Sequence, residues 1–251
     1  MPDVINPTPL STDRLSVLRD QLRHVYARVW RLPRMHRTYG ALSVAETFRR
    51  IYRTKAWGDN GEAFCSGLGS RGPVAQLYCA SVAQFIQDHR IQSVVDLGCG
   101  DFTVGRQIVE ASGDIRYTGI DVVPEMIEHH QKTNSDPRVS FRCADISRDP
   151  LPKADLCLIR QVLQHLSNEE IARVLANLGS FSKILISEEV PNHPGPVNRD
   201  KPHGPDVRGY FGSGVYVEEP PFSMKTVELW KFELTPYSVL RTVLRDQTAT
   251  Q

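Results

Sequence analysis

The fold of this 251-residue chain is decided by the stretch Ser93-Val-Val-Asp-Leu-Gly-Cys-Gly-Asp101. Two more apolar runs follow along the chain, and they end at Asp121 and at Asp145-Ile146. Short apolar runs that each end in an acidic residue, with a glycine pair after the first, are typical of the ligand-binding edge of an open parallel sheet. The sequence therefore predicts an α/β fold with a nucleotide-type site at the carboxyl ends of its strands.

The glycine pair narrows the kind of nucleotide. Gly98 and Gly100 allow a tight turn with positive φ that approaches a ligand closely, and a helix is predicted over 103–111. A dinucleotide fingerprint would need a third glycine at position 103, where Thr103 stands, so a pyrophosphate ligand is disfavoured.

The acidic residues at the strand ends are candidates for contacts to an adenosyl group. Asp121 lies about twenty residues beyond the turn and is predicted to accept hydrogen bonds from ribose hydroxyls. Asp145 and Ile146 are predicted to hold the adenine amine and ring edge. The alternative is that each aspartate caps the helix that follows it. Three acids in register favour the binding site.

These motifs resemble those of the class I S-adenosylmethionine-dependent methyltransferases over roughly 76–189. The resemblance implies a Rossmann-like, seven-stranded, mostly parallel sheet with helices on both faces. It also implies S-adenosyl-L-methionine as the cofactor. The residues expected to contact the cofactor are Asp96, Gly98, Cys99, Gly100, Asp121, Val122, Asp145, Ile146, Arg160, Trp57, Ser70 and Arg71.

Four further motifs resemble a bacterial subgroup of these enzymes: Trp57-Gly58, Ser66-Gly-Leu-Gly-Ser70, Arg160-Gln-Val-Leu-Gln-His165-Leu and Pro221-Phe222. In the subgroup, the loop over 57–71 closes the cofactor site. The chain departs from the pattern at Gln161, where the subgroup has an aspartate.

Gln161 and His165 are the candidate catalytic residues. They are four apart, so a helical turn would place both side chains on one face, pointing into the site. A neutral imidazole accepts a proton from a substrate hydroxyl, which makes His165 the candidate general base and leaves Gln161 to orient a ligand. The alternative is that His165 is a core residue.

The N-terminal segment is a basic, helical addition over 1–56. It holds eleven Lys and Arg against four Asp and Glu, whereas the rest of the chain holds 19 against 25. Apolar residues recur in it at steps of three and four, which predicts a helix with one apolar seam. The seam packs on its own domain or forms a homodimer contact. A third alternative is binding to nucleic acid or to an anionic membrane, but basic charge alone does not favour it, and we expect no nucleic-acid partner. The residues of the seam are Leu15, Leu18, Leu22, Val25, Val29 and Leu32.

A proline-rich insertion over 190–221 interrupts the methyltransferase domain, which is assigned to 57–251. Seven prolines exclude a regular helix there, and the position beside the ligand edge predicts a substrate lid. Its cationic and aromatic side chains suit an anionic or sugar-like acceptor; the alternative is a mobile loop. No metal site is expected. The predicted substrate contacts are Arg199, His203, Arg208, Tyr210 and Phe211.

The remaining predictions concern the C-terminal segment and the cellular location of the protein. A strand is predicted over 226–234 and a short helix from Tyr237 to Arg245. No apolar stretch approaches the roughly 18 residues of a membrane span, and the N-terminus does not read as a signal peptide. Five cysteines without a CxxC pair suggest reduced thiols and a cytoplasmic protein.

We expect methyl transfer to a small-molecule or glycan acceptor, with oxygen as the methylated atom. Two alternatives stay open. One is N-methylation of an amino-acid, peptide or natural-product amine. The other is a module that binds the cofactor without chemistry.

Overall fold

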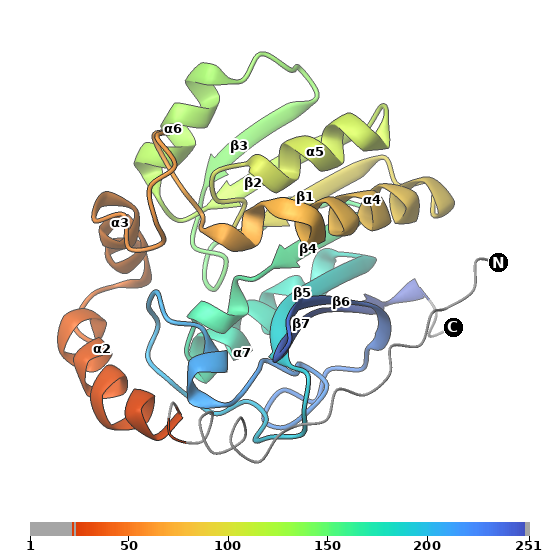
Figure 1. The fold of residues 1–251 in the computed structure, drawn as a ribbon. Helices are drawn as coiled ribbons and strands as arrows, with labels where there is room; N and C mark the ends of the chain where they lie inside the picture. Colours follow the sequence, from red (N-terminus) through yellow and green to blue (C-terminus); the bar gives the residue numbers. More distant parts are fainter. Residues whose placement is uncertain (1–21, 23, 249–251) are drawn as a thin grey trace.

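The computed structural model describes residues 22 and 24–248. Seven strands form one sheet in the order β3-β2-β1-β4-β5-β7-β6 (Figure 1). The first five strands are parallel to one another, whereas β7 is antiparallel to both β5 and β6. This confirms the predicted seven-stranded, mostly parallel sheet. The strands are β1 (Ser93–Leu97), β2 (Arg116–Asp121), β3 (Val139–Cys143), β4 (Leu156–Arg160), β5 (Lys183–Pro191), β6 (Val227–Thr235) and β7 (Ser238–Asp246).

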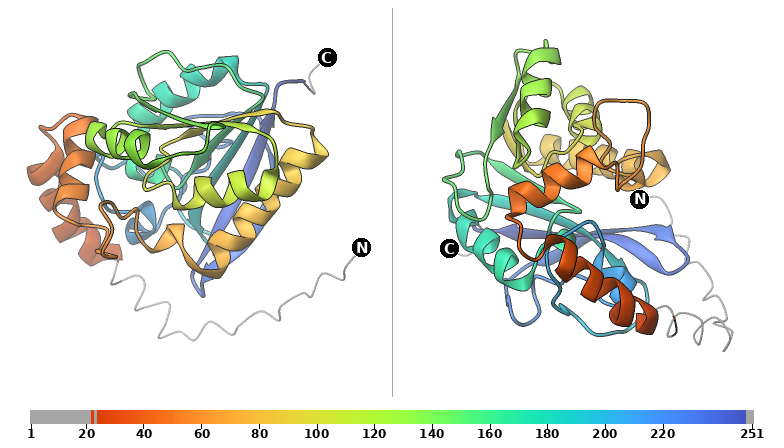
Figure 2. Two further views of the ribbon diagram at one scale, coloured as in Figure 1. Left: turned by 90° about the horizontal axis from the view of Figure 1, so that it is seen from above. Right: turned by 90° about the vertical axis from the view of Figure 1, so that its left-hand side faces the viewer.

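Helices cover both faces of the sheet, because side chains along each strand alternate between two apolar cores. On one face, Val94 and Leu158 pack in a cluster with residues of α4 (Gly72–Asp88) and α5 (Thr103–Ser112). On the other face, Val95 and Cys157 pack with α7 (Asn168–Asn177). Helix α6 (Pro124–Thr133) contacts β2 and β3 (Figure 2).

Short helices connect these elements near the carboxyl ends of the parallel strands. They are η2 (Leu68–Ser70), η3 (Leu163–His165), η4 (Leu178–Ser180) and η5 (Arg208–Phe211).

The helix predicted from Tyr237 to Arg245 is wrong, because this segment forms β7. All nine residues of β7 pair with β5, from Ser238 opposite Pro191 to Asp246 opposite Lys183. The segment is rich in β-branched residues, and the buried Thr242 hydroxyl lies 2.9 Å from the Ser187 hydroxyl on β5. Pairing with the otherwise open edge of β5 outweighs the weak helical pattern of the segment.

The N-terminal helices lie at the end of the sheet where the parallel strands finish (Figure 1). They are η1 (Ala27–Arg31), α2 (Leu32–Tyr39) and α3 (Val44–Arg53). Ser43 begins α3 with a capping box, in which its hydroxyl accepts from the Glu46 amide and the Glu46 carboxylate accepts from the Ser43 amide.

Among the described residues of the apolar seam, Leu32 packs against the cluster of Ala27, Met35 and Phe211, whereas the others are exposed. Leu22, Val25 and Val29 are 61%, 54% and 55% exposed. The helix packs through the buried side chains of Ala27 and Met35, which contact Phe211. Leu15 and Leu18 lie outside the described residues.

No described helix has both the length and the apolar character that a membrane crossing requires. All five cysteines are free thiols.

Candidate functional site

A cavity of about 1510 Å³ lies at the carboxyl ends of β1, β2, β4 and β5. It is larger than the roughly 300–1,000 Å³ of a typical small-molecule site, so it has room for two ligands side by side. The strand ends form its floor, and the other walls come from the N-terminal helices, the loop over 57–71, the insertion over 190–221 and the β6–β7 turn.

The glycine turn is packed so closely that only glycine fits. Gly98 has φ of +80°, and a Cβ placed there would lie 2.5 Å from Cγ2 of Val162. Gly100 has φ of +53°, and a Cβ there would overlap the Ser66 hydroxyl. The carbonyl of Gly100 is held by the buried His130 ring, whose Nε2 lies 2.8 Å away. Sequence reasoning missed His130, which carries no motif of its own.

Two buried carboxylates flank this turn. Asp121 accepts hydrogen bonds from the amides of Gly100 and Val123, both at 3.2 Å, and Asp96 accepts from the Tyr117 hydroxyl at 2.5 Å. Burial raises the pKa of each carboxyl to about 6, because the charged form loses hydration. Both side chains line the cavity, next to Cys99 and Val122.

Asp145 and Ile146 also line the cavity, at the end of β3. One carboxylate oxygen of Asp145 accepts from the Ser147 amide at 2.9 Å and from its hydroxyl at 2.7 Å. A turn over 146–148 follows Asp145, so the structure does not show the alternative, in which Asp145 caps a helix that follows it. The second carboxylate oxygen of Asp145, Oδ2, lies 3.9 Å from Nε of Arg148.

The loop over 57–71 is fastened across the glycine turn. The Ser66 amide donates to Oδ2 of Asp101 at 2.9 Å, and the Asp101 amide donates to the Ser66 hydroxyl at 2.8 Å. At the end of β4, Nη2 of Arg160 donates to the Gly69 carbonyl at 2.6 Å. Ser70 and Arg71 thereby become part of the cavity wall.

Trp57 joins this loop to the insertion. Its indole N–H donates to the Pro205 carbonyl at 3.1 Å, and its ring lies 5.2 Å from Tyr52 and 5.0 Å from His165. Tyr52 was not foreseen as part of the site. Its signal in the sequence is weak, because Tyr52 ends a helix far from the glycine motif.

Gln161 and His165 both line the cavity, but the predicted helical turn across them is wrong. Gln161 adopts a left-handed conformation with φ of +54° and packs over Gly69, while η3 begins only at Leu163. Such a conformation in a residue other than glycine is stabilised by its surroundings. Here the backbone N–H of Gln161 donates to the Ser187 carbonyl at 2.7 Å.

His165 is a poor base in this structure. Its side chain is 9% exposed, with Nδ1 3.2 Å from the Gly204 carbonyl. Burial and, to a smaller extent, the nearby Lys201 ammonium together lower the pKa of the imidazole to about 3. The structure therefore favours the alternative in which His165 is a core residue and not a general base.

Glu188, at the end of β5, holds the segment that carries both residues. Its carboxylate accepts from three consecutive amides, those of Val162 at 3.1 Å, Leu163 at 2.8 Å and Gln164 at 3.1 Å. Burial raises the pKa of Glu188 to about 7, although these hydrogen bonds favour its charged form.

Comparison with known proteins agrees with this geometry. Residues 94–183 match a family model described as a methyltransferase domain. The chain contains a methyltransferase domain. The fold is that of class I S-adenosylmethionine-dependent methyltransferases, as two solved structures show. Mitomycin 7-O-methyltransferase MmcR aligns with a TM-score of 0.55 at 14% identity, over 93% of this chain and 69% of that one.

Human N-acetylserotonin methyltransferase, solved in complex with SAM, aligns with a TM-score of 0.51 at 15% identity, over 92% of this chain and 67% of that one. Among curated proteins, daphnetin O-methyltransferase 1 of Secale cereale is 35% identical over 83 residues, which cover 33% of this chain and 22% of that protein. The chain thus aligns with about a fifth of that relative's length.

The insertion over 190–221 forms one cavity wall, but four of its five predicted substrate contacts do not line the cavity. Of the five side chains, Tyr210 lines the cavity, while Arg199, His203, Arg208 and Phe211 do not. Arg208 is 1% exposed and donates to the carbonyls of Leu166 at 2.8 Å and Arg199 at 2.5 Å.

The other cationic groups of the insertion also serve the fold. His203 lies 2.7 Å from the Glu170 carboxylate on α7 and 3.1 Å from the Leu42 carbonyl before α3. Arg199 lies 3.4 Å from the Phe211 carbonyl. Within 22 and 24–248, no three His, Cys, Asp or Glu residues are grouped to hold a metal ion.

Proposed function

We propose that this chain transfers a methyl group from S-adenosyl-L-methionine to a small-molecule acceptor, with oxygen as the methylated atom. The observation that carries the proposal is one large cavity. One half of it contains the glycine turn and Asp121, and the other half has room for an acceptor. When bound, the cofactor supplies an activated methyl on a cationic sulfonium.

The residues present fit this cofactor. Asp121 offers a carboxylate for ribose hydroxyls, and the turn at Gly98 and Gly100 lets the backbone approach a ligand. Three buried polar atoms of cavity-lining residues have no hydrogen-bond partner within the described part of the chain: Nε of Arg71, Nε of Arg160 and Oε1 of Gln164. Donors and an acceptor of this kind suit the carboxylate and the ammonium of an amino acid.

The charges of the cavity support the same cofactor. Seven carboxylate side chains and three arginines line it within the described residues. An acidic cavity favours a cationic ligand over an anionic one. The nucleophile then needs mainly to be held close to the methyl carbon, a task of orientation that the enclosing walls perform.

The proposal that oxygen is the methylated atom is supported by the names of similar proteins. Daphnetin O-methyltransferase 1 and mitomycin 7-O-methyltransferase are both named as O-methyltransferases.

Calorimetry and a labelled-methyl assay test the proposal. S-adenosylhomocysteine should bind and raise the melting temperature, whereas NAD should not. Protein incubated with methyl-labelled cofactor and a panel of phenols, alcohols and amines should label a hydroxyl. Label on nitrogen would contradict the proposed atom, and binding without turnover on any acceptor would indicate a non-catalytic module.

The proposal also includes an oligomeric state and a cellular location. The exposed apolar side chains of Leu22, Val25, Tyr26, Val29 and Trp30 support a homodimer contact through the N-terminal helix. The five free thiols support a cytoplasmic location.

A further inference from the structure

The half of the cavity beyond Gln161 is lined by three segments of the domain and one helix. We call it the acceptor half. Its walls are the end of β5 over 189–193, the insertion over 205–210, the β6–β7 turn over 234–238 and the N-terminal helix over 24–31. The Asn192 amide donates to the Tyr237 carbonyl at 3.0 Å, which fixes the turn against the end of β5.

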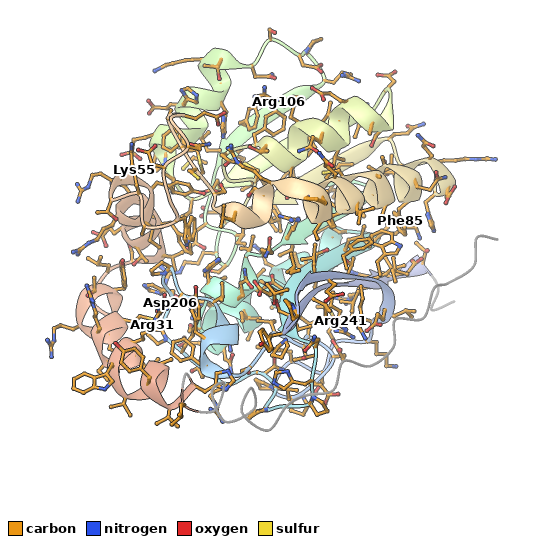
Figure 3. The ribbon with its side chains drawn as sticks, viewed as in Figure 1. Arg31, Lys55, Phe85, Arg106, Asp206 and Arg241 are labelled. Atoms are coloured by element: carbon orange, nitrogen blue, oxygen red, sulfur yellow. The ribbon has the colours of Figure 1, made fainter. Side chains whose placement is uncertain are left out.

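Each arginine that lines the cavity already has at least one partner within the described part of the chain, and the unpartnered Nε atoms of Arg71 and Arg160 are proposed to bind the carboxylate of the cofactor. Arg31 pairs with Asp206 at 3.3 Å, and Figure 3 shows these two side chains beside each other. Arg71 lies 3.3 Å from Glu62, and the Arg160 guanidinium donates to the Gly69 carbonyl and lies over the Tyr78 ring.

Six of the seven carboxylates that line the cavity are also engaged by hydrogen bonds or ion pairs. They are Asp96, Asp101, Asp121, Asp145, Glu170 and Asp206.

Glu189 is the exception among the described residues. Its half-buried side chain lines the acceptor half from a rigid strand and makes no hydrogen bond or ion pair within the described part of the chain. The alternation of β5 turns it away from its neighbour Glu188, which faces the amides of η3. An unpaired carboxylate on a cavity wall accepts hydrogen bonds from a ligand and repels a ligand of its own charge.

Aromatic surface accompanies this carboxylate. Tyr210 and Tyr237 line the acceptor half and are 40% and 47% exposed. The Arg31 guanidinium covers the Tyr210 ring at 4.4 Å, and Tyr237 stacks on no other described ring. Exposed ring faces in a concave site suit a flat apolar ligand.

We infer that the acceptor is an uncharged aromatic hydroxyl compound, whose hydroxyl donates to the Glu189 carboxylate. This inference rests on the proposed function and replaces the anionic or sugar-like acceptor expected from the insertion. The cations that suggested an anion are held by the fold, at Arg199, His203 and Arg208.

This inference is tested by calorimetry on protein saturated with S-adenosylhomocysteine, into which pairs of phenols are titrated that have similar shapes but differ in charge. N-acetylserotonin is an uncharged phenol, and 5-hydroxyindole-3-acetate is an anionic phenol of similar shape. Daphnetin, an uncharged coumarin diol, is compared in the same way with a carboxylated hydroxycoumarin. We expect the uncharged member of at least one pair to bind, and its anionic partner to bind at least tenfold more weakly.

The Glu189→Gln variant should weaken binding of the uncharged phenol about tenfold and narrow the gap between the two members of a pair, because a hydrogen bond to a charged group is lost. Its affinity for S-adenosylhomocysteine should not change. The control is Glu233→Gln, an exposed carboxylate on β6 outside the cavity, which should leave all affinities unchanged.

Three results would overturn the inference: tighter or equal binding of the anionic probes, binding by no uncharged phenol, or an unchanged preference in the Glu189→Gln variant. A protein that binds no S-adenosylhomocysteine would instead contradict the proposed function. The same probes titrated into the unsaturated protein would then still test the charge preference of the cavity.

Discussion

Gly98 shows how one residue sets the shape of the site. It shares a positive φ with Gly113, at +80° and +78°, but the surroundings differ. A Cβ at Gly98 would meet Val162 at 2.5 Å, whereas nothing lies within 4 Å of a Cβ at Gly113. An alanine at either position would be strained by the positive φ. Only at position 98 would its Cβ also clash with a neighbouring side chain.

We therefore expect Gly98→Ala to lower the free energy of unfolding by about 2–4 kcal/mol, from strain and overpacking together, and to weaken S-adenosylhomocysteine binding. The control Gly113→Ala should cost about 1–2 kcal/mol and leave binding intact. Urea unfolding and calorimetry measure both effects. Equal losses in the two variants would argue against the packing of Gly98 on Val162.

Asp121 makes cofactor binding depend on pH. Burial raises its pKa to about 6, and its carboxylate must be charged to accept two ribose hydroxyls. As the pH falls through 6, a growing fraction of the protein holds a proton that binding must release. The affinity for S-adenosylhomocysteine should therefore fall about tenfold from pH 7 to pH 5.

Calorimetry at several pH values checks this expectation. Asp121→Asn should weaken binding about 10–100-fold at pH 7 and reduce the pH dependence, because the titrating acceptor is lost. The exposed Glu128→Gln on α6 serves as the control. An affinity that rises toward pH 5 would contradict the assignment.

At the scale of elements, Glu188 joins β5 to η3. Glu188→Gln replaces one acceptor oxygen with an NH₂ group, which faces a backbone amide that donates to the native residue. We expect a loss of about 1–3 kcal/mol in unfolding free energy, because at least one buried amide of Val162, Leu163 or Gln164 loses its acceptor.

Hydrogen exchange resolves the effect, since the amides of 162–164 should exchange faster in this variant. Glu189→Gln, one residue further along β5, is the matched control and should leave their exchange unchanged. Equal protection of these amides in Glu188→Gln and in the native protein would show that the carboxylate does not hold η3.

At the scale of the whole molecule, the N-terminal helix presents an apolar surface to solvent. Val25 and Val29 are more than half exposed, and Trp30 is 66% exposed. We expect a homodimer in solution, because two copies that meet through this face remove its apolar side chains from water. Light scattering after size exclusion should give about twice the mass of 28.3 kDa.

The double variant Val25→Glu/Val29→Glu should give the monomer mass with its S-adenosylhomocysteine affinity unchanged. Thr133→Glu on α6, far from this face in the chain, controls for added charge. A monomeric native protein at high micromolar concentration would contradict the dimer.

Much of the cofactor half could be predicted from residues alone, because its determinants are local. A glycine pair after an apolar run permits only a few backbone shapes, and parallel strands bring Asp96, Asp121 and Asp145 to one edge. The helix predicted from Tyr237 to Arg245 failed because pairing with β5, fifty residues away, outweighs local periodicity.

The order of residues is enough to predict the sheet, the glycine turn and the acids that face the cavity, since each depends on short-range sterics and on alternation along a strand. Which charged side chains line the cavity depends instead on contacts between segments that are distant in the chain. Arg208 is buried and donates to backbone carbonyls, half-buried His203 pairs with Glu170, and Glu189 is left unpaired among the described residues. Pairing depends on the three-dimensional neighbours of a group, because the cost of burying an unpaired charge is what directs each cation to its partner.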